Sequence, residues 1–239
     1  MNRINLLTRE KLKKISTATI STSLFKRGLK NQFIQNVVPL KLHDGNMIGE
    51  AYTLRYIPAR EDLNSIDVFK SPDHPQRVAV ENCPSGAVLV IDSRKNARAA
   101  SAGSILITRL MKRNVAGIVT DGGFRDSEEI SELSFSSFHQ RPSAPTNLTL
   151  HQAIDINVPI ACGDVAVFPG DVIVGDKDGV IVIPSHMIEE IVEECINMTI
   201  FEEFVLQKVN EGRTIVGLYP LIDAKIKEEF EKWKLENKD

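Results

Sequence analysis

A strand–helix–strand pattern between residues 86 and 123 constrains the fold more than any other feature. The run GAVLVIDS (residues 86–93) is continuously apolar, which is typical of a β-strand covered on both faces. AGSILITRLMKRN (residues 102–114) has the spacing of an amphipathic helix, and VAGIVTDGG (residues 115–123) is a second short buried strand. Two buried strands joined by a helix form a parallel βαβ unit, so the sequence predicts an α/β protein.

The segments on either side complete a single predicted domain over residues 1–239. Residues 7–29 are predicted to be an N-terminal helix, and residues 185–239 a helical C-terminal extension with Ser185 as its first N-cap. In the core, about residues 45–184, GEAYTLRYIP is a predicted strand, and VPIACG, VAVFPGDVIVGD and GVIVIP are predicted antiparallel strands. The segment at residues 135–156 is rich in Pro, Ser and Asn, which favours a long irregular loop.

Composition excludes several classes of protein. A net charge of −3 gives no global attraction to nucleic acid, so we expect no nucleic-acid partner. No apolar run could span a bilayer, and the N-terminus lacks the apolar core of a signal peptide, so we expect no membrane association. The three cysteines are far apart and odd in number, which fits a reducing compartment. We therefore expect a cytoplasmic protein.

The segment TDGGFRDSEE (residues 120–129) is the strongest candidate for a functional site. Arg125 and Asp126 follow a predicted buried strand, at the edge where open α/β sheets place ligands, and Gly122 and Gly123 allow a close approach. Arginine binds a carboxylate through two parallel hydrogen bonds, and an aspartate can ligate a hard divalent cation. The pair therefore suits a small 2-oxo acid. The alternative is a local ion pair in which Asp126 or Ser127 caps the helix that begins at SEEI.

The start of the predicted helix at ASAGSILITRL could belong to the same site. Amides that follow a glycine at a helix N-terminus suit a carboxylate oxygen. The alternative is an ordinary helix start with Ser101 or Ser104 as the cap, and it is the stronger interpretation of this segment by itself.

Other motifs point away from competing chemistries. The three aspartates of PGDVIVGDKDGVIVIP lack the spacing of a calcium-binding loop and predict a tight hairpin. The five histidines show no zinc-binding spacing, although His139, Arg141 and His151 could border a pocket. No G-x-S-x-G, Walker A or G-x-G-x-x-G motif is present, which argues against hydrolase, P-loop and dinucleotide-binding functions.

Taken together, these motifs resemble the RraA-like family. The resemblance rests on STATISTSLFKRG, GAVLVIDS, AGSILITRLMKRNVAGIVTDGGFRD and VPIACGDVAVFPGDVIVGDKDGVIVIP, which cover most of residues 16–184 in order. The family includes 4-hydroxy-4-methyl-2-oxoglutarate / 4-carboxy-4-hydroxy-2-oxoadipate aldolases and the regulator of ribonuclease E activity. It implies a swivelling-type α/β fold with mixed β-sheets flanked by helices, assembled as a homotrimer or homohexamer.

The resemblance also implies roles for particular residues. Asp126 would bind Mg²⁺ or Mn²⁺ and Arg125 would contact the substrate, so both would be catalytic. A glutamate near the C-terminus of a neighbouring subunit, here Glu202 or Glu203, would complete the water shell of the metal. The backbone amides of one loop would hold the carboxylate of pyruvate; that loop corresponds to Gly103, Ser104, Ile105 and Leu106.

Two positions depart from the family pattern. Aldolase members usually carry an acidic residue where this chain has Ser104, and Thr22 replaces an aspartate that is common in the first helix. The loss of a carboxylate near the ion weakens the charge around it. The expected function is a divalent-metal-dependent lyase that releases pyruvate from a small 2-oxo acid by retro-aldol cleavage, or that decarboxylates oxaloacetate. The alternative is a non-catalytic regulator or binding protein of the ribonuclease machinery.

Overall fold

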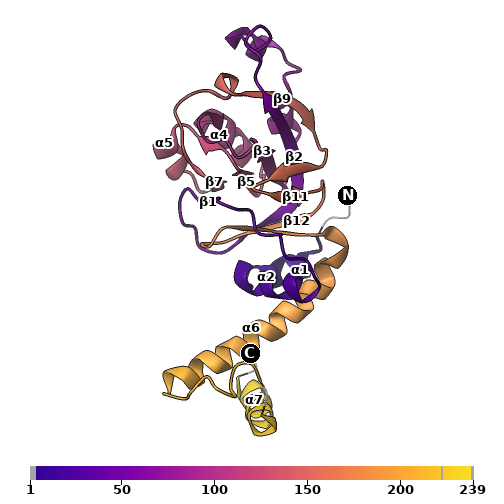
Figure 1. Cartoon of the computed structure of the whole chain (residues 1–239), viewed down its shortest axis with the longest axis vertical. Coiled ribbons are helices and arrows are strands. Elements are labelled where there is room, and N and C mark those ends of the chain that lie inside the picture. Colours follow the sequence, from indigo (N-terminus) through magenta and orange to yellow (C-terminus); the bar gives the residue numbers. More distant parts are fainter. Residues whose placement is uncertain (1–3, 222, 238–239) are drawn as a thin grey trace.

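The computed structural model describes residues 4–221 and 223–237, and its centre is a mixed eight-stranded sheet (Figure 1). The order is β1-β7-β5-β3-β2-β12-β13, and β9 pairs with β2 as well. The α/β class predicted from the sequence is confirmed. The strands of this sheet are β1 (Val38–Pro39), β2 (Met47–Pro58), β3 (Val88–Asp92), β5 (Gly117–Thr120), β7 (Ser136–His139), β9 (His151–Ile156), β12 (Val172–Gly175) and β13 (Val180–Ile183).

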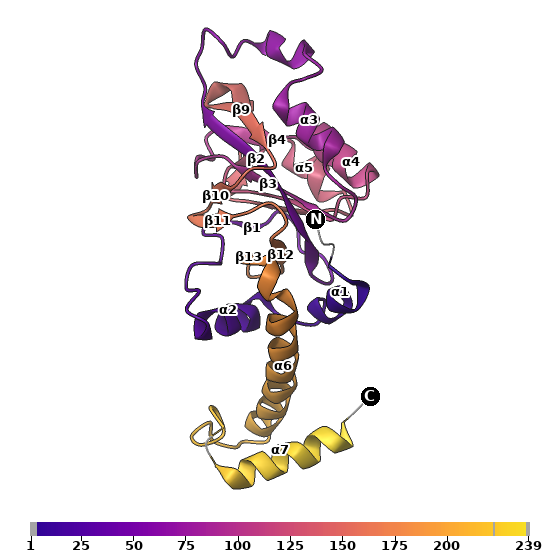
Figure 2. The same cartoon turned by 90° about the vertical axis from the view of Figure 1, so that its right-hand side faces the viewer.

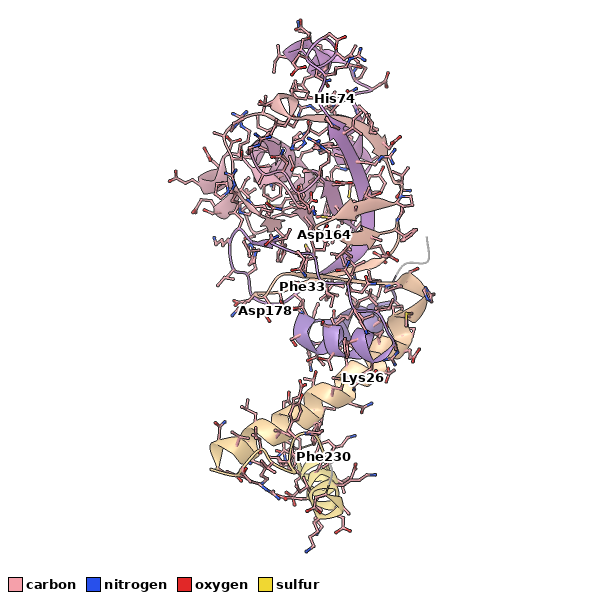
Figure 3. All side chains as sticks on the ribbon, in the orientation of Figure 1. Lys26, Phe33, His74, Asp164, Asp178 and Phe230 are labelled. Atoms are coloured by element: carbon pink, nitrogen blue, oxygen red, sulfur yellow. The ribbon has the colours of Figure 1, made fainter. Side chains whose placement is uncertain are left out.

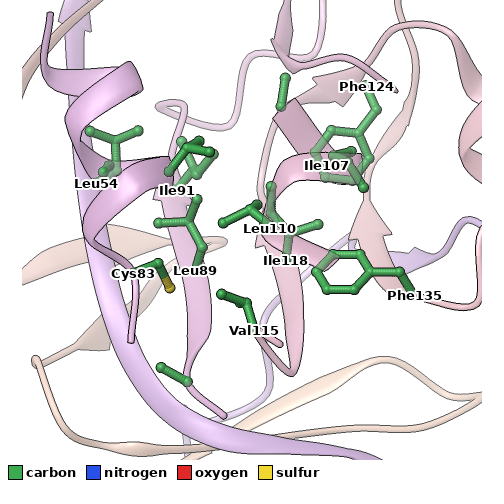
Figure 4. Packing of buried hydrophobic residues seen from close by; sticks show 14 of the residues in the cluster. Leu54, Cys83, Leu89, Ile91, Ile107, Leu110, Val115, Ile118, Phe124 and Phe135 are labelled. Carbon is green, nitrogen blue, oxygen red and sulfur yellow. The ribbon is translucent and has the colours of Figure 1, made fainter. Parts of the chain in front are cut away.

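The parallel part of the sheet carries the main core. β2, β3, β5 and β7 run parallel in register, and every residue of β3 and β5 is buried. One face packs against α3 (Pro75–Asn82), α4 (Ser104–Lys112) and α5 (Ser127–Ser131), through residues such as Leu89, Leu110 and Phe135 (Figure 4). The other face is covered by the hairpin of β10 (Ile160–Cys162) and β11 (Val165–Val167). The predicted βαβ unit is therefore confirmed.

The antiparallel strands predicted in the later core are confirmed as well. β10 pairs with β11, and β12 pairs with β13 along all four of its residues. The loop of the second hairpin closes through its own aspartates, since the amide of Asp178 donates to Asp176 Oδ1 over 2.9 Å. These aspartates therefore stabilise a tight turn, as their spacing in the sequence predicted.

The segment predicted to be a long loop contains regular structure instead. Between residues 135 and 156 lie β7, β8 (Arg141–Pro142), the 3₁₀ turn Asn147–Thr149 and β9. Its strands are short or lie at the edge of the sheet, where Ser, Pro and His are tolerated and alternation is weak. The loop prediction was therefore wrong for most of this segment.

The predicted N-terminal helix is two helices, α1 (Leu6–Leu12) and α2 (Thr17–Lys26). Ser16 separates them, because its backbone is extended and its side chain accepts from the amide of Thr19 over 3.1 Å. A serine at an N-cap position can begin a new helix even where the apolar residues continue at helical spacing. Both helices pack with α6 over the β12–β13 end of the sheet.

The C-terminal extension is helical, but Ser185 is not its N-cap. Ser185–Met187 form a 3₁₀ turn, and α6 (Ile188–Asn210) begins after it. In Figure 2, α6 runs away from the sheet and α7 (Ala224–Glu236) crosses its far end. A separate apolar cluster that includes Phe204 joins these two helices. None of the helices in the described part of the chain is long and apolar enough to cross a bilayer.

Candidate functional site

A second, three-stranded sheet brings the end of the βαβ unit together with the Arg-Asp pair. It consists of β4 (Ala100–Ala102), β6 (Gly123–Phe124) and β8, all parallel. The amide of Arg125 donates to the carbonyl of Ala102 over 3.1 Å, which places the pair beside the first turn of α4. A Cβ on Gly123 would lie 2.7 Å from Ser143 Cβ, so this glycine is required by close strand packing.

Asp126 lies at the start of two helices, α4 and α5. It occupies the N-cap position of α5 but makes no capping hydrogen bond there. Its Oδ2 accepts instead from the amide of Ser104 over 3.1 Å and from Ser104 Oγ over 3.3 Å, at the start of α4. Asp126 is therefore the N-cap residue of α5, as one interpretation of the sequence expected, but its side chain does not make the capping hydrogen bond. The expected ion pair is present, because Arg125 Nε donates to Asp126 Oδ1 over 3.3 Å.

The backbone of Asp126 is left-handed, with φ 58° and ψ 45°. Non-glycine residues rarely adopt this conformation, and aspartate and asparagine tolerate it best. The conformation turns the side chain back toward α4. Strained backbone of this kind is often found where a side chain is held for binding.

The first turn of α4 lacks the serine cap that its sequence suggested. Gly103 is the N-cap residue and has no side chain to offer, while Ser104 is the first helical residue. Ser101 is buried instead among hydroxyl groups, 2.7 Å from both Ser93 Oγ and Thr120 Oγ1. The amides of Ile105 and Leu106 lie in this turn, where an α-helix supplies no acceptors of its own. They are suited to an anion.

Gly103 allows Arg125 and Asp126 to lie close to the start of α4. A Cβ there would lie 2.6 Å from Asp126 Oδ2 and 2.8 Å from Arg125 Cγ. The backbone of Gly103 is extended, so the constraint comes from these neighbours and not from its own dihedral angles. Arg125, Asp126 and the first turn of α4 therefore meet at one place.

These residues face a cavity of about 360 Å³. Its charged groups are Arg77, Arg125 and Asp126. Sequence reasoning missed the contribution of residues 66–77 and 146–147, which carry no motif. The lining residues are Ile66, Phe69, Gln76, Arg77, Ala100, Ala102, Gly103, Ile105, Leu106, Arg125, Asp126, Thr146 and Asn147.

The electrostatics of the cavity keep Asp126 ionised. Partial burial raises the pKa of its carboxyl group, but hydrogen bonds from Ser104 and Arg125 outweigh that effect, and the pKa lies below its usual value. Its side chain is 32% exposed, which leaves room for a further ligand. A stably charged, accessible carboxylate is what a divalent cation requires.

The donor set fits a weakly anchored Mg²⁺ or Mn²⁺. No group of three or more His, Cys, Asp or Glu side chains that could enclose a metal ion occurs among residues 4–221 and 223–237. Mg²⁺ commonly takes only one or two protein carboxylates and completes its shell with water and substrate oxygens. Asp126 beside an open cavity matches that pattern, and its Oδ1, which accepts one hydrogen bond, retains acceptor capacity.

Several other residues considered from the sequence lie elsewhere. His139 is buried against the ring of Phe124, and His151 is stacked on Tyr56, so neither lines the cavity. Arg141 is exposed on β8 and is not part of the cavity wall either.

The positions proposed from the family pattern outside the loop are also remote from this cavity. Thr22 is exposed on α2. Glu202 and Glu203 lie on α6, which runs below the sheet in Figure 1, away from α4 and α5. Within one chain they are not part of the cavity wall.

Known proteins resemble this chain over most of its length. The family model described as "RraA-like: Aldolase/RraA" matches residues 17–182. A Halalkalibacterium halodurans protein named "Putative 4-hydroxy-4-methyl-2-oxoglutarate aldolase" is 32% identical over 181 residues, which cover 76% of this chain and 78% of that protein. Protein DlpA of Legionella pneumophila is 26% identical over 211 residues; these cover 88% of this chain but 32% of that protein, so this chain spans about a third of its length.

Solved structures agree with these sequence matches. The crystal structure of Streptomyces coelicolor RraAS2, described as an unusual member of the RNase ES inhibitor RraA protein family, is similar with a TM-score of 0.76 and 27% identity. The similarity covers 85% of this chain and 98% of that one. The family match, the mixed sheet flanked by helices and this structural similarity lead to one conclusion: the chain belongs to the RraA-like family.

Proposed function

We propose that this protein is a divalent-metal-dependent lyase that releases pyruvate from a small 2-oxo acid by retro-aldol cleavage, and that it also decarboxylates oxaloacetate. One observation carries the proposal: Asp126, Arg125 and Ile105 and Leu106 of the first turn of α4 share one cavity. The similarity to a protein named as a 4-hydroxy-4-methyl-2-oxoglutarate aldolase supports the same chemistry.

The chain offers two groups for the 2-oxo acid end of the substrate. The amides of Ile105 and Leu106 would donate hydrogen bonds to its carboxylate, since they lie at a helix N-terminus and have no acceptor within the helix. The guanidinium of Arg125 would donate to the keto oxygen as negative charge develops on it. A Mg²⁺ or Mn²⁺ ion held by Asp126 would supply Lewis-acid polarisation of that oxygen.

Both reactions break the same bond and differ in what leaves. The C3–C4 bond breaks, and its electron pair remains on pyruvate enolate, which then takes a proton at C3 from water. In the retro-aldol reaction, the C4 hydroxyl group must also lose a proton as it becomes a carbonyl group. In oxaloacetate decarboxylation, CO₂ leaves and no base is needed.

The cavity therefore favours decarboxylation. Among the described residues that line it, Asp126 is the only carboxyl group, and no histidine is present. An Asp126 engaged as a metal ligand is not free to act as a general base. Ser104, where aldolase members usually carry an acid, offers only a hydroxyl group already bonded to Asp126. We expect oxaloacetate decarboxylation to be faster than retro-aldol cleavage.

A non-catalytic regulator of ribonuclease activity is the second candidate. Ser104 favours it, because the loss of an acid at this position weakens catalysis, and the similar RraAS2 structure is described as a member of an RNase inhibitor family. The intact Arg125–Asp126 pair favours the lyase. As further proposals, the chain would act in the cytoplasm as a homotrimer or homohexamer and would need no nucleic-acid partner; sedimentation velocity would test the assembly.

The deciding experiment is pyruvate release from oxaloacetate and from 4-hydroxy-4-methyl-2-oxoglutarate, with Mg²⁺ or Mn²⁺ and again with EDTA. Metal without protein corrects for spontaneous decarboxylation. An Asp178→Ala variant, altered in the exposed β12–β13 turn, serves as the protein control. Metal-dependent pyruvate above the metal blank supports the lyase. A folded protein that gives none from either compound would favour the regulator.

A further inference from the structure

Arg77 is a second arginine in the cavity wall, and the chemistry above gives it no role. It is the third residue of α3, a helix that begins with Pro75 at its first position. It lines the same cavity as Arg125 and Asp126, yet it comes from a different element of the fold. His74, which precedes this helix, lies toward the end of the molecule opposite Phe230 of α7 (Figure 3).

The guanidinium of Arg77 is held by an aromatic ring and not by a carboxylate. Its Cζ lies over the ring of Phe69 at 4.7 Å from the centroid, and the residue is half-buried. Within residues 4–221 and 223–237, no hydrogen bond or ion pair joins its side chain to an acid. Many other arginines have such a partner: Arg109 donates to Glu81 over 2.8 Å, and Arg213 to Glu229 over 2.6 Å.

The charge of the cavity is therefore unbalanced. Two guanidinium groups and one carboxylate line it, and a divalent cation on Asp126 would add further positive charge. A monoanionic 2-oxo acid would satisfy the α4 amides and Arg125 but would leave Arg77 without an acceptor. A half-buried guanidinium that forms two parallel hydrogen bonds to a carboxylate is a strong and selective contact.

We propose that Arg77 binds the second carboxylate of a 2-oxo dicarboxylic acid, and that it thereby gives the cavity its preference for dianionic over monoanionic 2-oxo acids. Phe69 positions Arg77 through the cation–π contact. This inference rests on the proposed function, because it assumes that the 2-oxo acid end occupies the α4 side of the cavity.

The test compares two unreactive five-carbon acids that differ in the distal carboxylate, 2-oxoglutarate and 2-oxopentanoate. Their affinities are measured by isothermal titration calorimetry in Mg²⁺ buffer for the full chain and for Arg77→Gln, Arg77→Lys, Phe69→Leu and Arg60→Gln. Arg60 is an exposed arginine paired with Asp62, so its variant is the matched control.

The expected result is a selective loss. Arg77→Gln should weaken 2-oxoglutarate binding about 10- to 100-fold and change 2-oxopentanoate binding less than about twofold. Arg77→Lys and Phe69→Leu should give intermediate losses with the same selectivity, and Arg60→Gln should match the wild type. An equal loss for both acids, an unchanged preference, or no preference in the wild type would overturn the inference.

The same variants separate this inference from the proposed function. If the wild type shows the binding pattern but releases no pyruvate, the lyase proposal fails and the role of Arg77 stands. If the wild type releases pyruvate from 4-hydroxy-4-methyl-2-oxoglutarate and Arg77→Gln leaves kcat/KM unchanged, the lyase stands and the role of Arg77 fails.

Discussion

Two aspartates five residues apart, at the ends of β5 and β6, have opposite environments. Asp121 is fully buried, and its carboxylate accepts from the amides of Ser93, Lys95 and Gly163 over 2.6, 3.0 and 3.1 Å. Asp126 is 32% exposed, and its nearest donors lie at 3.1 to 3.3 Å beside the cavity.

The difference shows how one short segment supports both the fold and the site. The donors to Asp121 come from two other segments, so this carboxylate ties the end of β5 to the β3 loop and to the β10–β11 hairpin. Asp126 gains fewer tight contacts and remains accessible. A carboxylate enclosed by backbone amides stabilises a fold, whereas one with spare acceptor capacity beside a cavity can bind a ligand.

The sharpest test of this difference is Asp126→Asn. Asparagine also tolerates the left-handed backbone, so the change removes charge with little strain. We expect kcat/KM for oxaloacetate to fall on the order of 10³-fold, because the anionic ligand of the cation is lost. The free energy of unfolding in urea should change by less than about 1 kcal/mol. Near-normal turnover would show that the site lies elsewhere.

Asp121→Ala should reverse that pattern. Three amides, of which those of Ser93 and Gly163 are buried, would lose their acceptor, and each buried unsatisfied group costs about 1–3 kcal/mol. We expect the free energy of unfolding at pH 7.5 to fall by about 3 kcal/mol or more, measured by urea denaturation followed by circular dichroism. A loss below about 1 kcal/mol would mean that water or a local shift satisfies those amides.

pH dependence tests the burial of Asp121 directly. Burial raises its pKa to about 6, although the three amides act in the opposite direction. The folded state therefore binds the proton more tightly than the unfolded state, whose carboxyl group titrates near about 4. Stability from this group is largest below about pH 4 and is lost as pH rises past about 6, by roughly 3 kcal/mol.

The comparison that isolates this effect is wild type against Asp121→Asn, which does not titrate. As pH falls from 6.5 to 4.5, the wild type should gain unfolding free energy relative to Asp121→Asn. A shift in the other direction would show that the amides dominate and hold the pKa of Asp121 below its usual value.

The sequence could predict the parts of this molecule that depend on local patterns. The continuous apolar runs of β3 and β5 specify buried parallel strands, and the glycine and aspartate turns specify the β12–β13 hairpin. It could not predict the strands in residues 135–156, because edge pairing tolerates polar residues and proline. The break at Ser16 was missed because capping competes with a continuous helical pattern there.

For the site, the sequence could identify the residues but not all of their contacts. The Arg-Asp pair and the loop at Gly103 were recognisable from motifs, and the fold brings them together. The direction of Asp126, toward α4 and not α5, follows from its left-handed backbone, which no local pattern indicates. Arg77 enters the cavity through tertiary packing of α3 alone, so a single sequence gives no signal for it.

Gly103→Ala should disturb the Asp126 region without touching Asp121. The added Cβ would overlap Asp126 Oδ2 and Arg125 Cγ, while the extended backbone accepts alanine. We expect kcat/KM to fall about tenfold or more through displacement of the pair, with a loss of about 1 kcal/mol in unfolding free energy. Unchanged kinetics would mean that the Arg125 side chain moves aside at little cost.

Ser104→Asp is expected to have the smallest effect and tests what the cavity lacks. A carboxylate there would add a candidate base beside the metal ligand. Retro-aldol cleavage should therefore speed up about several-fold, while decarboxylation, which needs no base, should change less. Ser104→Asn, of the same size as aspartate but without charge, is the control.

Because Ser104 Oγ lies 3.3 Å from Asp126 Oδ2, the carboxylate of Ser104→Asp would also repel Asp126 unless a cation lies nearby. A faster retro-aldol rate that requires Mg²⁺ would show that the wild type is slow because it lacks a carboxylate at this position. Equal or lower rates would indicate that serine suits a different reaction at this site.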